Sequence, residues 1–150
     1  MRKQYFLLLL IIIAIIISCG GTPKFSDVAG KKWKLIEVSV DDRNIFFNRN
    51  TLSSESAGDI FTFNFDDQNI NMIGAPSPCS GRYTLGDNQA ISLGSMNTTQ
   101  MDPLRQPEKL RESDFFVYMQ NVYKWNVVSR KLELYSKTEN GTEVKMVFSL

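Results

Sequence analysis

The stretch Ile60-Phe61-Thr62-Phe63-Asn64-Phe65-Asp66 decides the fold of this chain. Its three phenylalanines alternate with threonine, asparagine and aspartate, so an extended segment would have one aromatic face and one polar face. Successive side chains of a β-strand point to opposite sides of the sheet. The stretch therefore predicts a strand over residues 60–66 whose phenylalanines enter a core.

The same period of two recurs on both sides of this stretch and predicts seven further strands. They span residues 33–40, 69–73, 81–85, 90–93, 122–128, 131–136 and 143–148. The connections are short, and Asn140-Gly141 is a pair that tolerates the positive φ angles of a type I′ hairpin. Eight antiparallel strands would expose edges in one flat sheet. We therefore expect a mainly β fold, a small closed or partly closed barrel.

One segment departs from this period. Pro107 suits the first turn of a helix. Apolar residues then follow at helical spacing on one side: Phe115, Tyr118, Met119 and Val122. We expect a helix near residues 107–120 that lays this apolar side over the barrel.

The amino terminus has the parts of an export signal in order. Two basic residues, Arg2 and Lys3, precede an uninterrupted apolar run over residues 5–17. The run is shorter than the roughly 20 residues that a transmembrane helix needs. It ends at Ile17-Ser18-Cys19-Gly20, which resembles the lipobox of bacterial lipoproteins. We expect cleavage after Ser18 and lipidation of Cys19; the alternative is an ordinary secretory signal.

These signals divide the chain into a signal peptide at 1–18, a lipidated cysteine with a flexible tether at 19–32, and one domain at 33–150. The whole chain has 17 basic and 16 acidic residues, and this near-neutral balance argues against nucleic acid as a partner. We expect a monomer held on a membrane by its lipid anchor, in the cell envelope outside the cytoplasm. The absence of aspartate directly after Cys19 favours the outer membrane.

The chain has no histidine, which excludes histidine metal sites and histidine-activated nucleophiles. We expect no catalytic residue, no cofactor and no metal. Cys79 is the one thiol left after lipidation of Cys19, and it follows the proline-rich stretch Ala75-Pro76-Ser77-Pro78 in a turn before a strand. Without a histidine to lower its pKa, a buried structural cysteine is favoured over a reactive thiol or an intermolecular disulfide.

Several motifs, in this order, resemble the META domain family, which includes the bacterial heat-shock protein HslJ. They are Trp33-Lys34-Leu35, Phe61 to Phe65, Gly81-Arg82-Tyr83-Thr84-Leu85, Thr99-Gln100-Met101, Glu112 to Met119, and Val122-Tyr123-Lys124-Trp125. The resemblance covers roughly residues 33–150. It implies a calycin-like β-barrel with one helix, in a secreted or lipid-anchored envelope protein linked to stress tolerance or secretion. Pro76 and Ser77 replace the family's Gly-Cys-Asn motif, so roles of that cysteine do not carry over.

Six large residues would line the barrel interior, either as a filled core or as a ligand pocket: Phe61, Phe63, Phe65, Met72, Tyr83 and Trp125. A filled core is favoured for a barrel of this size. The expected function is that of a non-enzymatic, lipid-anchored envelope protein, a stress-associated or accessory, pilot-like factor that binds another envelope component. The alternative is a carrier of a hydrophobic small molecule or lipid. An enzyme is the third and weakest hypothesis.

Overall fold

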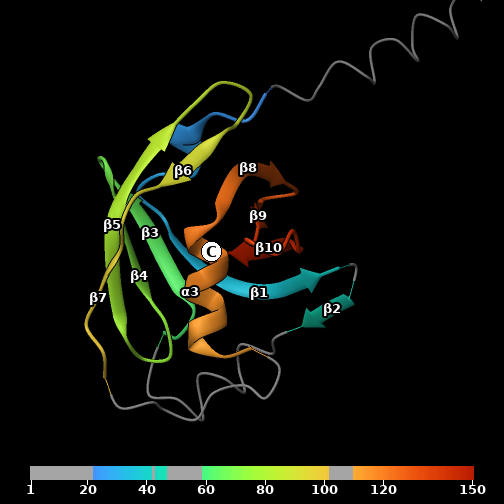
Figure 1. Cartoon of the computed structure of the whole chain (residues 1–150). Coiled ribbons are helices and arrows are strands. Elements are labelled where there is room, and N and C mark those ends of the chain that lie inside the picture. Colours follow the sequence, from blue (N-terminus) through green and yellow to red (C-terminus); the bar gives the residue numbers. More distant parts are fainter. Residues whose placement is uncertain (1–21, 42, 47–58, 102–109) are drawn as a thin grey trace, which may run out of the picture.

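The computed structural model describes residues 22–41, 43–46, 59–101 and 110–150 (Figure 1). The expected helix start at Pro107 lies outside these residues. The first half of the described chain holds the 3-10 helix η1 (Phe25–Asp27) and the strands β1 (Lys32–Val40), β2 (Arg43–Phe46), β3 (Thr62–Asp66), β4 (Asn69–Ile73) and β5 (Pro78–Leu85). The second half holds β6 (Ile91–Leu93), β7 (Asn97–Thr98), α3 (Glu112–Gln120), β8 (Val122–Val128), β9 (Lys131–Lys137) and β10 (Glu143–Ser149).

The strands form one antiparallel sheet that is nearly closed into a barrel. Its order is β6-β5-β4-β3-β1-β10-β9-β8, with β2 beside β1 and β7 beside β5. The two end strands approach each other where Trp125 N donates to Gln89 O over 3.0 Å, and Ala90 forms an isolated bridge with Lys124. The expected small antiparallel β-barrel is therefore confirmed.

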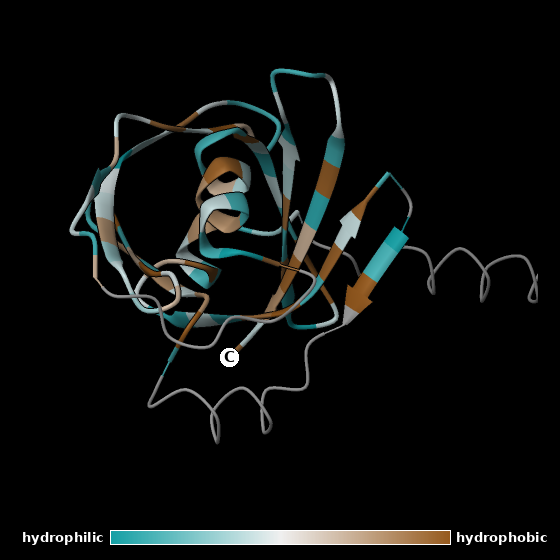
Figure 2. Ribbon diagram, turned by 60° about the horizontal axis from the view of Figure 1, so that its bottom comes forward, coloured by the Kyte–Doolittle hydropathy of each residue, from teal (hydrophilic) through white to brown (hydrophobic). Residues whose placement is uncertain are grey.

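Alternation along the strands builds the core, as the bands of hydrophobic and hydrophilic residues in Figure 2 show. Phe63 and Phe65 are both buried, and Phe63 meets Phe148 of β10 edge-on at 4.8 Å between ring centroids. The register of β1 against β10 shifts between Leu35 and Glu37. Such a bulge increases local twist and helps a sheet to curve.

The strand predicted over residues 60–66 starts later than expected, at Thr62. Phe61 has a φ of +50°, a left-handed conformation that is rare for a bulky residue. Its backbone N donates to Gly74 O over 2.9 Å, and its carbonyl accepts from Leu35 N over 3.0 Å. Phe61 therefore marks a bend before β3, although its ring is still buried, 5.2 Å from that of Phe115.

The helix begins at Glu112, so residues 110–111 do not continue it back toward Pro107 as expected. Arg111 is extended, and its backbone N donates to the carboxylate of Asp114 over 3.1 Å, which caps the first turn. Phe115 and Met119 are buried as the spacing predicts. Val122 is buried too, but it already belongs to β8, so the apolar spacing ran past the end of the helix.

Polar contacts tie both ends of α3 to the barrel. The Glu112 carboxylate accepts hydrogen bonds from Ala75 N, from Ser77 N at 2.7 Å and from Ser77 Oγ at 3.0 Å, all in the connection between β4 and β5. At the other end, Gln120 Nε2 donates to Leu93 O and Gly94 O at 3.2 and 3.1 Å. The helix is therefore fixed across the barrel by both its first and its last turn.

The segment expected to be a flexible tether contributes to the fold before Trp33. The ring of Phe25 in η1 lies 5.1 Å from Phe65, 5.4 Å from Tyr83 and 5.3 Å from Trp125, measured between centroids. Val28 is fully buried, and its carbonyl accepts a hydrogen bond from Trp33 Nε1 at 2.9 Å. The ordered domain therefore includes residues 25–32, which packing on an aromatic core stabilises.

The tight type I′ turn lies elsewhere than the sequence indicates. At Asn140-Gly141 only Gly141 has a positive φ, +81°, and its N donates to Thr138 O over 2.8 Å. Between β8 and β9, however, Ser129 and Arg130 have φ angles of +50° and +64° in a two-residue loop. The expectation of a type I′ turn at Asn140-Gly141 was wrong, because the wider loop there needs one left-handed residue.

Arg130 therefore offers a test of the turn. The Arg130→Gly variant removes a left-handed cost of about 1–2 kcal/mol, and glycine's greater freedom in the unfolded chain offsets part of this. We expect the free energy of unfolding in urea to rise by about 0.5–1 kcal/mol. Asn140→Gly is the matched control at a turn position without positive φ, and it should give no gain. A loss of stability with Arg130→Gly would contradict the turn assignment.

Glu112 offers a test of the helix attachment. The Glu112→Ala variant leaves the donors of Ala75 and Ser77 without their charged acceptor, and both residues are buried. We expect thermal or urea unfolding to report a loss of about 3 kcal/mol. Glu139→Ala, at an exposed turn, is the control and should change stability by less than about 0.5 kcal/mol. Equal losses in the two variants would argue against the attachment.

Candidate functional site

The six residues proposed as core or pocket are all buried, with at most 9% of any of them exposed. Phe65, Tyr83 and Trp125 come together around the Phe25 ring, which no sequence pattern had placed there. Phe63 packs on Phe65 at 5.2 Å between ring centroids.

The other members of this set lie at two further places in the core. Met72 pairs with Phe63 and with Cys79 across the sheet, whereas Phe61 lies apart beside α3. The interior of the described barrel is thus occupied by rings in mutual contact. Cys19, the expected lipidation site, lies outside the described residues.

Cys79 lies inside β5 and not in a turn, because the strand begins at Pro78. Its side chain is 4% exposed; Thr98 Oγ1 donates to its sulfur over 3.2 Å, and its thiol lies 3.7 Å from Met96 Sδ. The thiol is therefore buried, as the sequence predicts, and it packs β5 against β7.

The outer surface of the barrel carries a continuous row of polar side chains across five strands. Cross-strand pairing aligns Lys32 of β1 with Asn64 of β3, Asn64 with Asn71 of β4, Asn71 with Ser80 of β5, and Ser80 with Asn97 of β7. We call these five residues the polar row. Four of them are exposed and Asn64 is half-buried, so the row is available to solvent.

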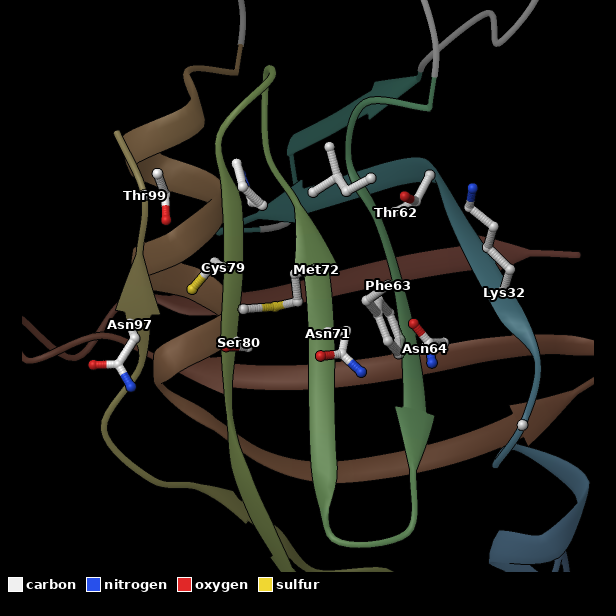
Figure 3. Close-up of a pocket in the computed structure, with 13 residues that line it drawn as sticks. Lys32, Thr62, Phe63, Asn64, Asn71, Met72, Cys79, Ser80, Asn97 and Thr99 are labelled. Carbon is white, nitrogen blue, oxygen red and sulfur yellow. The ribbon is translucent and has the colours of Figure 1, made fainter. Parts of the chain in front are cut away.

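Two adjoining hollows follow this row. The first has a volume of about 640 Å³ and extends from Lys32 to Asn97 and Thr99 (Figure 3). The second, of about 550 Å³, shares Asn71, Ser80 and Asn97 with the first and reaches Arg82. Together they form a groove on the outside of β3, β4 and β5, with β7 as one rim. We call it the polar groove after the polar row along it, although apolar residues such as Ile73 and Pro78 also line the first hollow.

The side chains in the middle of the groove are not used to hold the described fold together. Among the described residues, no hydrogen bond joins the side chain of Asn64, Asn71, Ser80 or Asn97 to another protein group. At the β1 end, by contrast, Lys32 and Lys34 both face the Asp59 carboxylate, Lys34 at 3.8 Å. The centre of the row thus offers uncharged donors and acceptors to a partner.

The sequence contains part of the signal for this groove. Asn64, Asn71 and Ser80 occupy polar positions of three consecutive hairpin strands. The alternation predicted all three strands, but the strand expected over residues 81–85 started after Ser80. Their alignment depends on the registers of those hairpins. Asn97 completes the row from β7, a two-residue strand that the alternation did not predict. Such a short polar strand carries no alternation to detect.

The resolved pKa shifts fall mainly on tyrosines. Burial raises the pKa of Tyr83, and the charges of Asp67 and Asp66 raise it further. Burial likewise raises the pKa of Tyr118. Tyr135 has the largest shift: burial, a hydrogen bond from its hydroxyl to Glu133 and the charge of Glu133 raise its pKa to about 12. These shifts move phenol ionisation further from neutral pH.

In the described part of the chain, no group of three or more cysteine, aspartate or glutamate side chains is placed to hold a metal ion. The described helices include none with the length and apolar character needed to cross a bilayer.

Strand order, near closure and the helix fixed across the strands define the class: a small antiparallel β-barrel with one α-helix in the described part of the chain. Solved structures that share this fold include the following two. An NMR structure of a protein from Burkholderia xenovorans aligns with a TM-score of 0.58 and 15% identity, over 88% of this chain and 94% of the other. A crystal structure of a DUF4847 family protein from Bacteroides vulgatus aligns with a TM-score of 0.53 and 17% identity, over 83% of this chain and 95% of the other. No family model and no curated protein matches the sequence.

The central side chains of the polar groove should contribute little to the stability of the fold. Asn71→Ala and Ser80→Ala remove outward side chains without internal hydrogen bonds, so each should change the free energy of unfolding by less than about 0.5 kcal/mol. Ser77→Ala is the matched contrast, because its buried hydroxyl bonds to Glu112 and accepts from Met101 N at 3.3 Å. We expect it to cost about 1–3 kcal/mol in urea unfolding. Large losses of unfolding free energy in the Asn71→Ala and Ser80→Ala variants would show instead that the polar row stabilises the fold.

Proposed function

We propose that the chain is a non-enzymatic, lipid-anchored envelope protein that binds another envelope component through the polar groove. The observation that carries the binding role is the row of side chains without internal hydrogen bonds, aligned over neighbouring strands. A fold gains little from such side chains, whereas a partner gains hydrogen bonds at fixed spacing. The lipobox-like Ile17-Ser18-Cys19-Gly20 supports the anchor, and the resemblance to the META family supports a stress-associated or accessory role.

The chemistry of the groove favours a polar partner of low charge. Asn64, Asn71 and Asn97 each offer both donors and acceptors through their carboxamides. The charged groups at its ends are of both signs, with Lys32 facing Asp59 at one end and Arg82 lining the same hollow as Asp66 at the other. Recognition by hydrogen bonds, more than by net charge, suits an exposed polar segment of an envelope protein. Such binding depends weakly on salt.

The second candidate, a carrier of a hydrophobic small molecule, would use the barrel interior. Phe65, Tyr83 and Trp125 are in contact with Phe25 at ring distances of 5.1 to 5.4 Å. A ligand there would have to displace these packed rings. The outer groove is open without any rearrangement, and for this reason we favour the binding role.

Site-specific photocrosslinking in the native host tests the proposal. A photoreactive residue at Asn71 should give a discrete adduct, whereas one at Glu139, exposed in the β9–β10 turn, should not. Adding Asn64→Ala and Ser80→Ala should weaken the adduct several-fold and reduce survival under envelope stress toward that of a deletion strain. Equal adducts at Asn71 and Glu139, or full survival with the substituted groove, would contradict the proposal.

A further inference from the structure

The described chain begins at a fixed point on the barrel, close to the expected lipidation site. Phe25 is held by the rings of Phe65, Tyr83 and Trp125, and Thr22 and Pro23 line a hollow with residues of the β5–β6 connection. Thr22 is three residues after Cys19. Three fully extended residues span about 10 Å.

From this we infer that the end of the barrel carrying η1 faces and contacts the phospholipid bilayer, so the domain is oriented on the membrane and does not swing on a long tether. The inference rests on the proposed lipid anchor at Cys19. We call this end the η1 end and define it by Thr22, Phe25 and the β5–β6 connection, residues 86–90. The opposite α3 end is defined by residues 74–77 and the first turn of α3.

The two ends are separated by the length of the strands. β3 runs from Thr62, which pairs with Ile73 near the α3 end, to Asp66 beside the η1 end. Five residues of strand span about 16 Å. Gly30 N donates to Phe65 O at the η1 end, whereas Glu112 bonds to Ser77 at the other. Figure 1 shows η1 and the first turn of α3 at opposite ends of β3, β4 and β5. A chain of at most about 10 Å between Cys19 and Thr22 therefore holds the η1 end at the bilayer and leaves the α3 end far from it.

The η1 end carries an exposed apolar side chain suited to this contact. Leu85 is 47% exposed and lines the hollow that also contains Thr22 and Phe25. Leu85 is therefore placed to enter the headgroup region.

Charge at this end does not select for anionic lipid. Lys24 and Lys124 are accompanied by Asp27 and Asp87, and Lys124 Nζ lies 5.9 Å over the Tyr135 ring. Vesicles of phosphatidylcholine alone are therefore a sufficient probe.

Depth-dependent fluorescence quenching tests the orientation. The full lipidated chain is labelled at Asp87→Cys at the η1 end or, as the matched control, at Ser113→Cys in the first turn of α3; both positions are exposed. Buried Cys79 stays in place, and the chain without an added cysteine reports background labelling. In phosphatidylcholine vesicles containing headgroup nitroxide lipids, we expect several-fold stronger quenching at Asp87→Cys. A flexible insertion of about 20 residues before Thr22, with a reach of about 25 Å, should remove the difference.

Mass spectrometry of Cys19 distinguishes failure of the proposed orientation from failure of the proposed lipid anchor. An acylated chain with stronger quenching at Asp87→Cys that is lost on insertion supports the orientation. An acylated chain quenched equally at both positions, or unaffected by the insertion, overturns the orientation and leaves the anchor intact. A chain without acyl mass on Cys19 overturns the anchor, and the orientation with it.

Discussion

The packing of Phe25 against Phe65, Tyr83 and Trp125 is the contact on which the rest of the molecule depends. These rings belong to η1, β3, β5 and β8, so one cluster joins the start of the domain to both halves of the sheet. It lies where Trp125 N and Gln89 O close the barrel. Burying such aromatic side chains contributes about 1.5–3 kcal/mol each, more than the backbone hydrogen bond from Trp125 N to Gln89 O contributes. The closure of the barrel is therefore stabilised mainly by the aromatic cluster in its interior.

The filled interior limits where the protein can act. Each strand alternates, so the residues that fill the barrel leave an equal set of side chains facing outward. Over β3, β4 and β5 that outward set consists largely of amides and hydroxyls, and register brings them into one row. The same period of two that produced the core thus also produced the groove.

Strands could be predicted from the alternation of their apolar residues. Features that depend on distant contacts or on strand register could not. The strand at Asn69–Ile73 has the expected ends because its apolar residues alternate up to a turn. The strand at Val122–Val128 also has the expected ends, although a bulge between Val122 and Lys124 interrupts its alternation. η1 was missed because Phe25 and Val28 are isolated apolar residues whose burial depends on distant rings. The turn at Ser129-Arg130 was missed because the register of β8 and β9 imposes its φ angles, and neither residue favours them. The groove needed the registers of four strand pairs, which no local pattern contains.

The two surfaces proposed for this protein are compatible only because of how they are arranged on the barrel. The strands under the groove run between the η1 end and the α3 end, so a domain seated on its η1 end directs the groove sideways. A partner could then occupy the groove without displacing the domain from the bilayer. With the proposed anchor at Cys19, the few residues between Cys19 and Phe25 would also lower the freedom of the membrane-bound domain, so less orientational entropy would be lost when a partner associates. A fixed orientation of the η1 end on the bilayer would thus favour binding of a partner in the polar groove.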